Sequence, residues 1–440
     1  KVLESIIRDH IMDYFIRCKL FSEKQFGFIK GRSTVLQLLK VLDQWTAWLE
    51  EGGSVDVIYT DFEKAFDKVP HKRLISKLKS YGIDPVLIRW IEGFLLYRRQ
   101  RVTVKGKFSD WRKVLSGIPQ GSVLGPLLFV IFINDLPEIL KENGDLYLFA
   151  DDAKIINHIK SIEDQQKLQQ ICNSFKEWSD RWLVKLNINK CLVLRLRYGN
   201  IHTGVKDCRY TLSECGQVQE LLEVRSTRDL GVVVDDKLEF REHITEKIKK
   251  AYSTLAIINR NFKYVDKESF ITLYKSMVRS HLEYADSVWS PHKVGLIEEL
   301  EKVQKRATKI FQNCKNKKYM DRLKFLGIPT LVYRRHRGDM IEVYKILHSV
   351  YDNVGPRLTR VEGNITRGHS MRLKVNRCRY DIRKYSFSNR IVNVWNGLPE
   401  EVVTAGSVNA FKNRLDRFWQ GQEVVYNYKA KLTGAGMCFM

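Results

Sequence analysis

Hydrophobic and polar positions alternate and repeat along the chain in ways that predict both strands and helices. The β-branched run at residues 55–60 and the apolar runs at 144–148 and 153–156 have the length and composition of buried strands. At residues 71–78 and 158–185 the apolar positions recur with the period of an amphipathic helix. The mixture predicts an α+β protein.

Turn and capping residues refine these elements. Asp84 followed by Pro85 is typical of a helix N-cap with proline at the first helical position. Residues 101–104 alternate as a further strand, and residues 243–289 contain two helical patterns. From residue 291 to about residue 420 the pattern stays mostly helical.

The most informative polar residues are two adjacent aspartates, Asp151 and Asp152. They lie between the apolar runs 144–148 and 153–156, so the segment is typical of a β-hairpin with both carboxylates at its tip. Neighbouring carboxylates repel each other and are costly to desolvate, so a pair at a hairpin tip indicates a cation between them. The alternative interpretation is an ordinary aspartate-rich turn.

A third carboxylate, Asp61, follows the predicted strand 55–60 directly and precedes Asp151 by 90 residues. A strand-end aspartate facing a hairpin-tip pair is the layout of a two-metal phosphoryl-transfer site. Mg²⁺ prefers hard oxygen ligands and keeps bound waters, so one or two protein carboxylates together with substrate phosphates suffice.

The segment between these acids contains a loop rich in glycine and proline. Residues 115–129 read LSGIPQGSVLGPLLF, with three glycines and two prolines in an otherwise apolar stretch. Glycines allow the backbone to approach a nucleotide or template base closely. Gln120 adds an amide that can both donate and accept a hydrogen bond. A simple loop before a buried helix is the alternative.

Six motifs in this order resemble the reverse transcriptase of non-LTR (LINE-type) retrotransposons, close to the jockey-like group. They are QFGFIKGRST at residues 25–34, DFEKAFD at 61–67, SGIPQGSVLGP at 116–126, FADD at 149–152, LNINKC at 186–191 and DLGV at 229–232. The resemblance implies an RNA-directed DNA polymerase. Such an enzyme extends a DNA 3′-OH on an RNA template with dNTPs by two-metal phosphoryl transfer.

The resemblance also implies a right-hand polymerase architecture and assigns its parts to this chain. They are partial fingers (1–52), a palm with the catalytic core (53–235), thumb helices (236–290), a basic, mostly helical C-terminal domain (291–420) and a loose tail (421–440). Relatives have an earlier fingers segment and an upstream endonuclease domain. We therefore expect this chain to be truncated at its N-terminus.

Carried over to this sequence, the resemblance makes Asp61 and Asp151 metal ligands and Asp152 the third catalytic acid. The main-chain carbonyl of Phe62 would also face the metal. The implied cofactor is a pair of Mg²⁺ ions, with Mn²⁺ as an alternative.

The resemblance assigns further residues to the incoming dNTP. Phe66 matches the steric gate, because a bulky ring there would clash with a ribose 2′-OH. Gln120 matches a nucleotide contact, and Lys190 matches a lysine near the phosphates, although a solvated turn lysine is the alternative for Lys190. Lys30 and Arg32 match fingers residues that could meet the triphosphate or the template.

Charge supports a nucleic-acid partner. The 440 residues carry a formal net charge of +24, and residues 301–420 contain 26 Lys and Arg against 10 Asp and Glu. Such a basic surface favours a polyanionic partner, and aromatic residues among the basic ones can stack on bases. The predicted nucleic-acid-binding residues are Arg334, Arg335, Arg337, Arg377, Arg379, Arg383 and Lys384. Solvated helix faces are the alternative.

The eight cysteines include no C-x-x-C pair, and the longest apolar run is too short for a membrane span. We expect reduced thiols and an intracellular protein, which the resemblance places in nucleus and cytoplasm as a ribonucleoprotein. Its partners would be an RNA template, a DNA primer or target site and dNTPs, with no membrane.

A catalytically silent remnant that only binds nucleic acid is the alternative function. An RNA-dependent RNA polymerase is disfavoured by Phe66.

Overall fold

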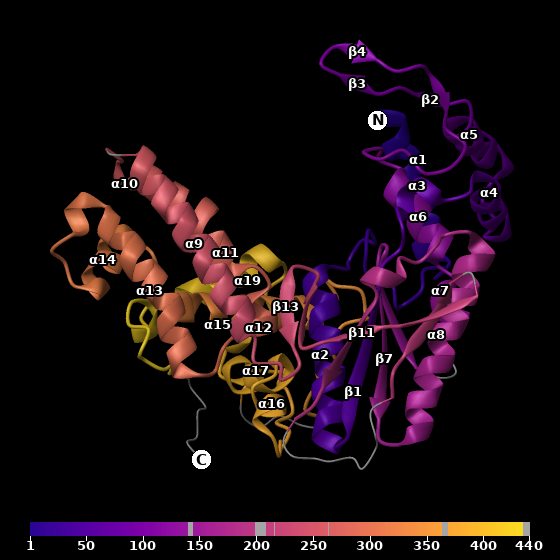
Figure 1. Cartoon of the computed structure of the whole chain (residues 1–440). Helices are drawn as coiled ribbons and strands as arrows, with labels where there is room; N and C mark the ends of the chain where they lie inside the picture. The colour runs from indigo at the N-terminus through magenta and orange to yellow at the C-terminus, as the bar shows by residue number, and fades with distance from the viewer. Residues whose placement is uncertain (140–143, 199–207, 215, 263, 363–367, 434–440) are drawn as a thin grey trace. The chain divides into compact units, whose positions relative to one another are not determined.

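A computed structural model of the chain describes residues 1–139, 144–198, 208–214, 216–262, 264–362 and 368–433 (Figure 1). The chain forms two compact units. Unit 1 comprises residues 1–37 and 52–225, and unit 2 comprises residues 38–51 and the chain from residue 226 onward. Both helices and strands are present, which confirms the predicted α+β class.

A five-stranded sheet forms the centre of unit 1. Its strands, in spatial order, are β11 (Leu222–Val224), β8 (Leu192–Leu196), β1 (Ser54–Thr60), β7 (Asp152–Ile159) and β6 (Asp145–Phe149). The central strand β1 is antiparallel to β7 and β8, and β11 is parallel to β8. All residues of β1 except Tyr59 are buried, which explains its apolar, β-branched sequence.

Helices and small hairpins complete unit 1. The helices are α1 (Val2–Arg17), the start of α2 (Thr34–Glu51), α3 (Ala65–Lys68), α4 (His71–Ser80), α5 (Pro85–Leu95), α6 (Gly125–Ile133), α7 (Leu136–Ile139), α8 (Ile162–Trp182) and the 3₁₀ turn η1 (Ile188–Lys190). The small hairpins are formed by β2 (Arg99–Gln100) with β5 (Arg112–Lys113), β3 (Thr103–Val104) with β4 (Lys107–Phe108), and β9 (Thr211–Glu214) with β10 (Gln217–Glu220). The Asp84 side chain accepts a hydrogen bond from the Val86 N–H, which confirms the predicted N-cap.

The helix predicted at residues 158–185 is shorter at both ends and spans Ile162–Trp182. The helix expected from His158 begins only at Ile162, because residues as far as Ile159 pair with β1 as part of β7. Ser161 and Asp164 then form a capping box that starts the helix. Leu168, Ile171, Phe175 and Trp178 face the core as expected.

The loop at residues 116–126 leads into a helix that is buried almost throughout. Residues 127–133 of α6 all lie in the hydrophobic core of unit 1, with exposed fractions of 2% or less. A helix that is apolar on every side must be surrounded by protein. The helix therefore anchors one end of the loop in the core.

Unit 2 is mainly helical. Its elements are β12 (Ser226–Asp229), β13 (Val232–Asp235), α9 (Arg241–Asn261), α10 (Lys267–Leu273), the π-helix η2 (Tyr274–Arg279), α11 (Ser280–Glu283), α12 (Asp286–Trp289), α13 (Val294–Ile310), η3 (Gln312–Cys314), α14 (Tyr319–Leu326), α15 (Leu331–Leu347), α16 (Asp381–Lys384), α17 (Phe387–Asn396), α18 (Glu400–Val403), α19 (Val408–Phe418) and η4 (Glu423–Val425). The residues of α2 from Leu38 onward also belong to this unit.

The expected loose tail is packed over its described part. Val424 is fully buried, and its carbonyl accepts a hydrogen bond of 2.6 Å from the Thr330 hydroxyl. The Val425 carbonyl accepts a further bond from the Thr330 N–H. Residues 434–440 of the predicted tail lie outside the described residues. In the part of the chain that the structure describes, no helix has the length and apolar character needed to cross a membrane.

Candidate active site

The predicted catalytic acids lie at one end of two adjacent strands. Thr60 of β1 pairs with Ala153 of β7, so Asp61 follows β1 at the place where Asp152 begins β7. Asp151 precedes Asp152 in the turn between β6 and β7. The sheet register therefore brings all three acids to the same edge.

A buried glutamine supports the turn that carries Asp151. Ala150 has a left-handed backbone (φ 54°), which is costly for a residue with a Cβ. The Gln25 side-chain oxygen accepts hydrogen bonds from the N–H of Ala150 (2.9 Å) and of Gly27 (2.7 Å). Gln25 is fully buried, so both bonds are shielded from water. The glutamine holds the strained turn in place.

Gly27 allows this close approach. A Cβ atom at position 27 would lie 2.4 Å from the Ala150 nitrogen and 3.0 Å from the Phe149 carbonyl carbon. Both neighbours are backbone atoms, so a side chain would displace the turn itself. This contact explains the glycine in the motif at residues 25–34.

Two electrostatic contacts characterise the acids. Burial raises the pKa of the Asp151 carboxyl, and the negative charge of Asp61 raises it further. The Lys190 ammonium lies 3.3 Å from Asp61 Oδ2, with side chains that are 66% and 39% exposed. Because both groups are solvated, the pair is weak and can rearrange. Lys190 therefore lies at the acid cluster.

The loop at residues 116–126 is hydrogen-bonded along the segment that follows Asp61. The N–H groups of Gly117 and Ile118 donate to the carbonyls of Val69 and Phe66, both at 2.8 Å. Gly117 has φ 86°, and a Cβ there would lie 2.5 Å from the Asp67 carbonyl oxygen. Only glycine therefore fits this crossing without displacing one of the two segments.

The loop brings two predicted nucleotide contacts together. Gln120 is exposed, and its amide donates to Asp67 Oδ1 at 2.9 Å. The neighbouring Phe66 is partly buried and stacks on Phe129 of α6, with ring centroids 4.4 Å apart. The side chain of Phe62, by contrast, is buried and stacks on Phe175 of α8, which leaves its main chain as its contribution to the site.

The two predicted fingers residues differ in their surroundings. Lys30 is exposed. Arg32 donates from Nη1 to the carbonyls of Ser22 (2.6 Å) and Gln25 (2.5 Å). Arg32 thus stabilises the backbone that positions Gln25.

Four of the predicted nucleic-acid-binding residues in unit 2 are engaged within the chain. Arg334 forms a two-bond pair with Glu283, and Arg337 forms one with Asp416. Arg383 contacts Asp43 at 2.6 Å, and Arg335 is only 5% exposed. The three paired arginines stabilise unit 2, and none of the four offers an exposed charge to a nucleic acid.

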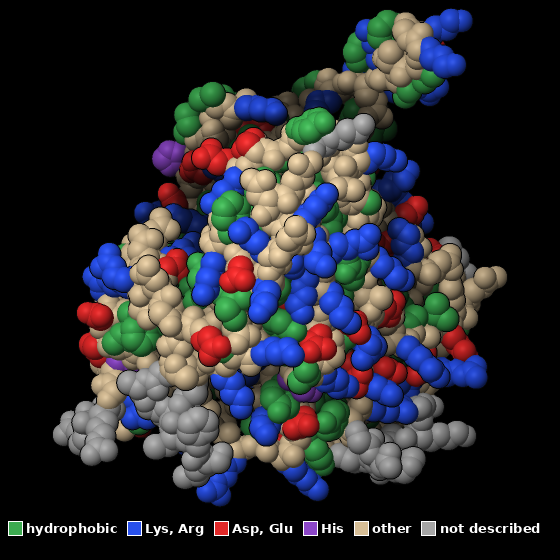
Figure 2. All heavy atoms as spheres, turned by 90° about the vertical axis from the view of Figure 1, so that its left-hand side faces the viewer, with side chains coloured by type: hydrophobic (Ala, Val, Ile, Leu, Met, Phe, Trp, Pro, Cys, Tyr) green, Lys and Arg blue, Asp and Glu red, His purple; other side chains and the backbone are tan. Residues whose placement is uncertain are grey.

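Three of the predicted basic residues are exposed, namely Arg377, Arg379 and Lys384. Arg379 lies against the ring of Tyr380, and Lys384 lies against the ring of Tyr385. Lys and Arg side chains are spread widely over the face of the molecule shown in Figure 2. These three remain candidates for contact with a polyanion.

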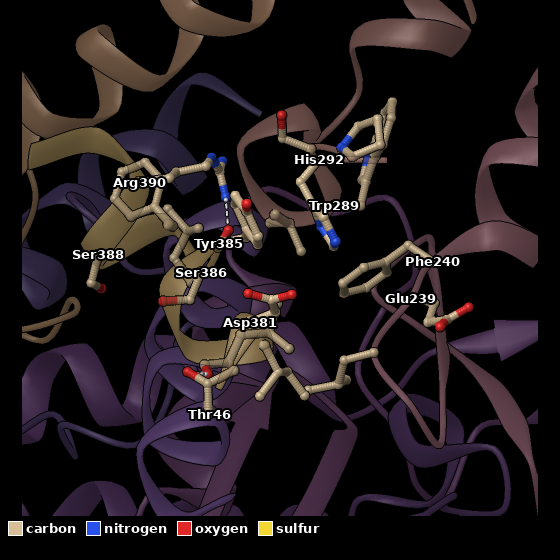
Figure 3. Close-up of a pocket in the computed structure, with 18 of the residues that line it drawn as sticks. Thr46, Glu239, Phe240, Trp289, His292, Asp381, Tyr385, Ser386, Ser388 and Arg390 are labelled. Atoms are coloured by element: carbon tan, nitrogen blue, oxygen red, sulfur yellow. Dashed lines mark hydrogen bonds between the residues drawn. The ribbon is translucent and has the colours of Figure 1, made fainter. Parts of the chain in front are cut away.

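A separate cavity lies within unit 2 (Figure 3). The rings of His292 and Tyr385 stack at 4.2 Å beside it, and Arg390 donates to the Tyr385 carbonyl. Arg390 also forms a two-bond pair with Asp339. The residues that line this cavity include none of the predicted site residues, so we assign it to the packing of unit 2.

The acids suit a magnesium site in which substrate phosphates supply part of the metal ligands. Among the described residues, no group of three or more His, Cys, Asp or Glu side chains is arranged to hold a metal by itself. Asp61 and Asp151 nevertheless supply two hard oxygen donors at the same end of adjacent strands. Mg²⁺ commonly takes one or two carboxylates and completes its shell with water and substrate phosphates, so the donor set fits.

The comparison with protein families agrees with this geometry. Residues 1–234, more than half of the chain, match the family model described as reverse transcriptase (RNA-dependent DNA polymerase). The chain belongs to the reverse transcriptase family. The right-hand polymerase architecture inferred from the motifs is that of this family.

Its relatives include RNA-directed DNA polymerases of mobile elements. The chain is 30% identical over 303 residues to the RNA-directed DNA polymerase of the mobile element jockey from Drosophila funebris. The match covers 66% of this chain and 32% of that protein. It is 25% identical over 399 residues to the probable RNA-directed DNA polymerase of transposon BS from Drosophila melanogaster. That match covers 84% of this chain and 39% of the relative. Both elements are non-LTR retrotransposons, which confirms the resemblance. The chain spans about a third of the length of these relatives.

Solved structures similar to the reverse transcriptase chain include a telomerase from Candida albicans in complex with a fragment of telomeric RNA. Its TM-score is 0.42 at 10% identity, and the match covers 71% of this chain and 56% of that chain.

Sequence reasoning missed the residues that support the acids. Gln25 and Gly27 lie in a recognised motif, but their contact with Ala150 joins positions more than a hundred residues apart. No local pattern reveals such a contact. The one local signal is a polar Gln and a Gly on either side of Phe26, at the apolar start of the motif.

Proposed function

We propose that this chain is the polymerase part of a non-LTR retrotransposon protein. It extends a DNA 3′-OH on an RNA template, with dNTPs as substrates. The observation that carries the proposal is the convergence of Asp61, Asp151 and Asp152 at one sheet edge in a chain of the reverse transcriptase family.

In this proposal the chain's own residues organise the reaction. Asp61 and Asp151 would hold the divalent ions together with the Phe62 carbonyl, and Asp152 would be the third acid. When bound, two Mg²⁺ ions would stabilise the charge on the attacking and leaving oxygens. Gln25 and Gly27 fix the turn that carries Asp151, because they contact the backbone of Ala150.

The neighbouring residues bind and select the nucleotide. The ring of Phe66 excludes a ribose 2′-OH, and Gln120 orients the incoming base or sugar from the adjacent loop. Lys190 moves from Asp61 to the triphosphate when the nucleotide arrives, since its ion pair is solvated. Lys30 offers an exposed positive charge to the triphosphate or template.

Primer extension tests this function. The purified chain should extend oligo(dT) on poly(rA) with dTTP and Mg²⁺, and EDTA should stop the reaction. Failure to extend while the chain still binds RNA would favour a silent nucleic-acid-binding protein instead. The working location would be a ribonucleoprotein in cytoplasm and nucleus, which localisation of a tagged chain together with its RNA would test.

A further inference from the structure

An exposed β-ribbon in unit 1 has a composition that the polymerase site does not explain. It consists of the hairpin strands β2 to β5, which project from the rest of the unit beyond α5 (Figure 1). Every residue from 99 to 113 is exposed. Four apolar side chains on it, Val102, Val104, Phe108 and Trp111, are each more than half exposed and lie among basic residues, which is typical of a binding surface.

The backbone gives the ribbon a defined shape. Lys105 and Gly106 both have positive φ (48° and 79°), as in the two-residue type I′ turn that suits the twist of paired strands. Gln100 pairs with Arg112, whereas the Val102 carbonyl accepts a hydrogen bond from the Ser109 N–H and the Val102 N–H donates to the Ser109 hydroxyl. One residue on the first strand therefore faces two on the second, which makes a bulge and increases the twist.

The side chains of the ribbon suit a polyanion. Residues 99–113 contain six Lys and Arg and a single acid, Asp110. The guanidinium of Arg101 lies 3.9 Å from the ring centre of Phe108 and 4.6 Å from that of Trp111, both of which are more than half exposed. These stacked groups stiffen the ribbon and keep positive charge at its surface.

The base of the ribbon is joined to the loop that carries Gln120. Arg98 donates to the carbonyl of Gly117 at 2.6 Å, and His71 contacts the same oxygen at 2.8 Å. Arg98 also donates to the Leu95 carbonyl at the end of α5. The ribbon is thus anchored rigidly beside the candidate active site of the same unit.

We propose that this ribbon inserts into the major groove of B-form DNA and contacts its phosphates through Lys105, Lys107 and their basic neighbours. The major groove of B-DNA is about 12 Å wide and admits a two-stranded ribbon, whereas the A-form major groove is deep and narrow. The shape of the ribbon therefore selects a DNA duplex over an RNA duplex. The inference concerns binding alone and does not depend on polymerase activity.

The test measures binding without metal or dNTPs. Fluorescence anisotropy compares a DNA duplex and an RNA duplex of the same sequence, titrated with the whole chain between about 50 and 200 mM salt. The ribbon variant is Lys105→Gln/Lys107→Gln. The matched control is Lys72→Gln/Lys79→Gln, which removes two exposed lysines from α4 of the same unit.

The ribbon variant should flatten the slope of log affinity against log salt for DNA by about 1.8, since each lost phosphate contact removes about 0.9. At 0.1 M salt this corresponds to a loss of up to roughly 60-fold in DNA affinity, with a smaller loss for RNA and little change in the control. An unchanged DNA affinity, an equal loss in the control variant, or an equal or larger loss for the RNA duplex would overturn the proposal. Because both lysines are exposed, thermal melts of the two variants should match the parent chain.

Discussion

The Gln25 side-chain oxygen accepts a hydrogen bond of 2.9 Å from the Ala150 N–H, and this bond ties the first motif of the chain to the turn that carries Asp151. Ala150 is held in a left-handed conformation, so the turn depends on outside support. We infer that the catalytic geometry of Asp151 depends on a residue that never touches substrate.

Substitution of this glutamine should uncouple binding from catalysis. Gln25→Ala leaves the buried N–H groups of Gly27 and Ala150 without an acceptor, which should cost about 2–4 kcal/mol of unfolding free energy. Primer extension should fall strongly while RNA affinity stays unchanged. Chemical denaturation, extension assays and anisotropy measure the three quantities.

A matched control exists at Gln37. Its side chain is also fully buried and donates to the Leu148 carbonyl, but that carbonyl accepts a second bond from the Phe26 N–H. Gln37→Ala removes the same volume but only one hydrogen bond, so it should cost less than Gln25→Ala and preserve extension. Equal losses in the two variants would mean that Gln25 only contributes to general packing.

Phe66 should control sugar selectivity. Phe66→Ala removes a ring that stacks on Phe129, so we expect a loss of about 2–4 kcal/mol in stability and a higher ratio of NTP to dNTP incorporation. Phe94→Ala removes a similar partly buried ring that stacks on Trp90 and should leave the ratio unchanged. If Phe66→Ala loses stability with no change in the ratio, the ring is a packing residue only.

The exposed basic residues of unit 2 should bind RNA, whereas the paired ones should not. Replacing Arg377, Arg379 and Lys384 with Gln should flatten the salt dependence of single-stranded RNA affinity by about 2, at about 0.7 for each phosphate. Arg337→Gln should instead lower stability, because it breaks a two-bond pair with Asp416. The prediction fails if the triple variant keeps the parent slope.

Acid should weaken unit 2 through a buried histidine. Burial and the positive charge of Lys247 lower the pKa of His243 to about 4, from an ordinary 6.5, and its Nδ1 accepts a hydrogen bond from the Val233 N–H. The unfolded chain binds this proton at a higher pH than the folded chain does. The contribution of the neutral His243 to the unfolding free energy is fully present above pH 6.5. It falls by about 3 kcal/mol as the pH is lowered to 4.

The variant His243→Asn isolates this effect. The Asn oxygen can replace Nδ1 as acceptor but does not titrate, so the stability of the parent relative to the variant should decline between pH 6.5 and 4. Denaturant unfolding at several pH values measures this difference. Parallel pH profiles for the two proteins would show that His243 does not titrate on unfolding.

The acids were predictable from sequence, but their supports were not. Asp61, Asp151 and Asp152 follow local strand and hairpin patterns, which a short window of residues contains. The pair between Arg337 and Asp416 joins residues 79 positions apart, so its arginine resembled an exposed basic residue in the sequence. The packed Val424 was missed for the same reason, since its partner Thr330 lies 94 positions away. Local patterns predict helices, strands and the acids at strand ends. Whether a basic side chain is exposed or paired with an acid depends on tertiary contacts, which local patterns do not contain.

The variant Asp151→Asn tests the central claim most directly. It keeps the size of the side chain and removes the charge that would hold the divalent ion. On poly(rA)/oligo(dT) with Mg²⁺, we predict that the parent chain extends the primer and that Asp151→Asn does not, while both bind RNA with equal affinity. Extension by Asp151→Asn at the parent rate would contradict the assignment of this sheet edge as the active site.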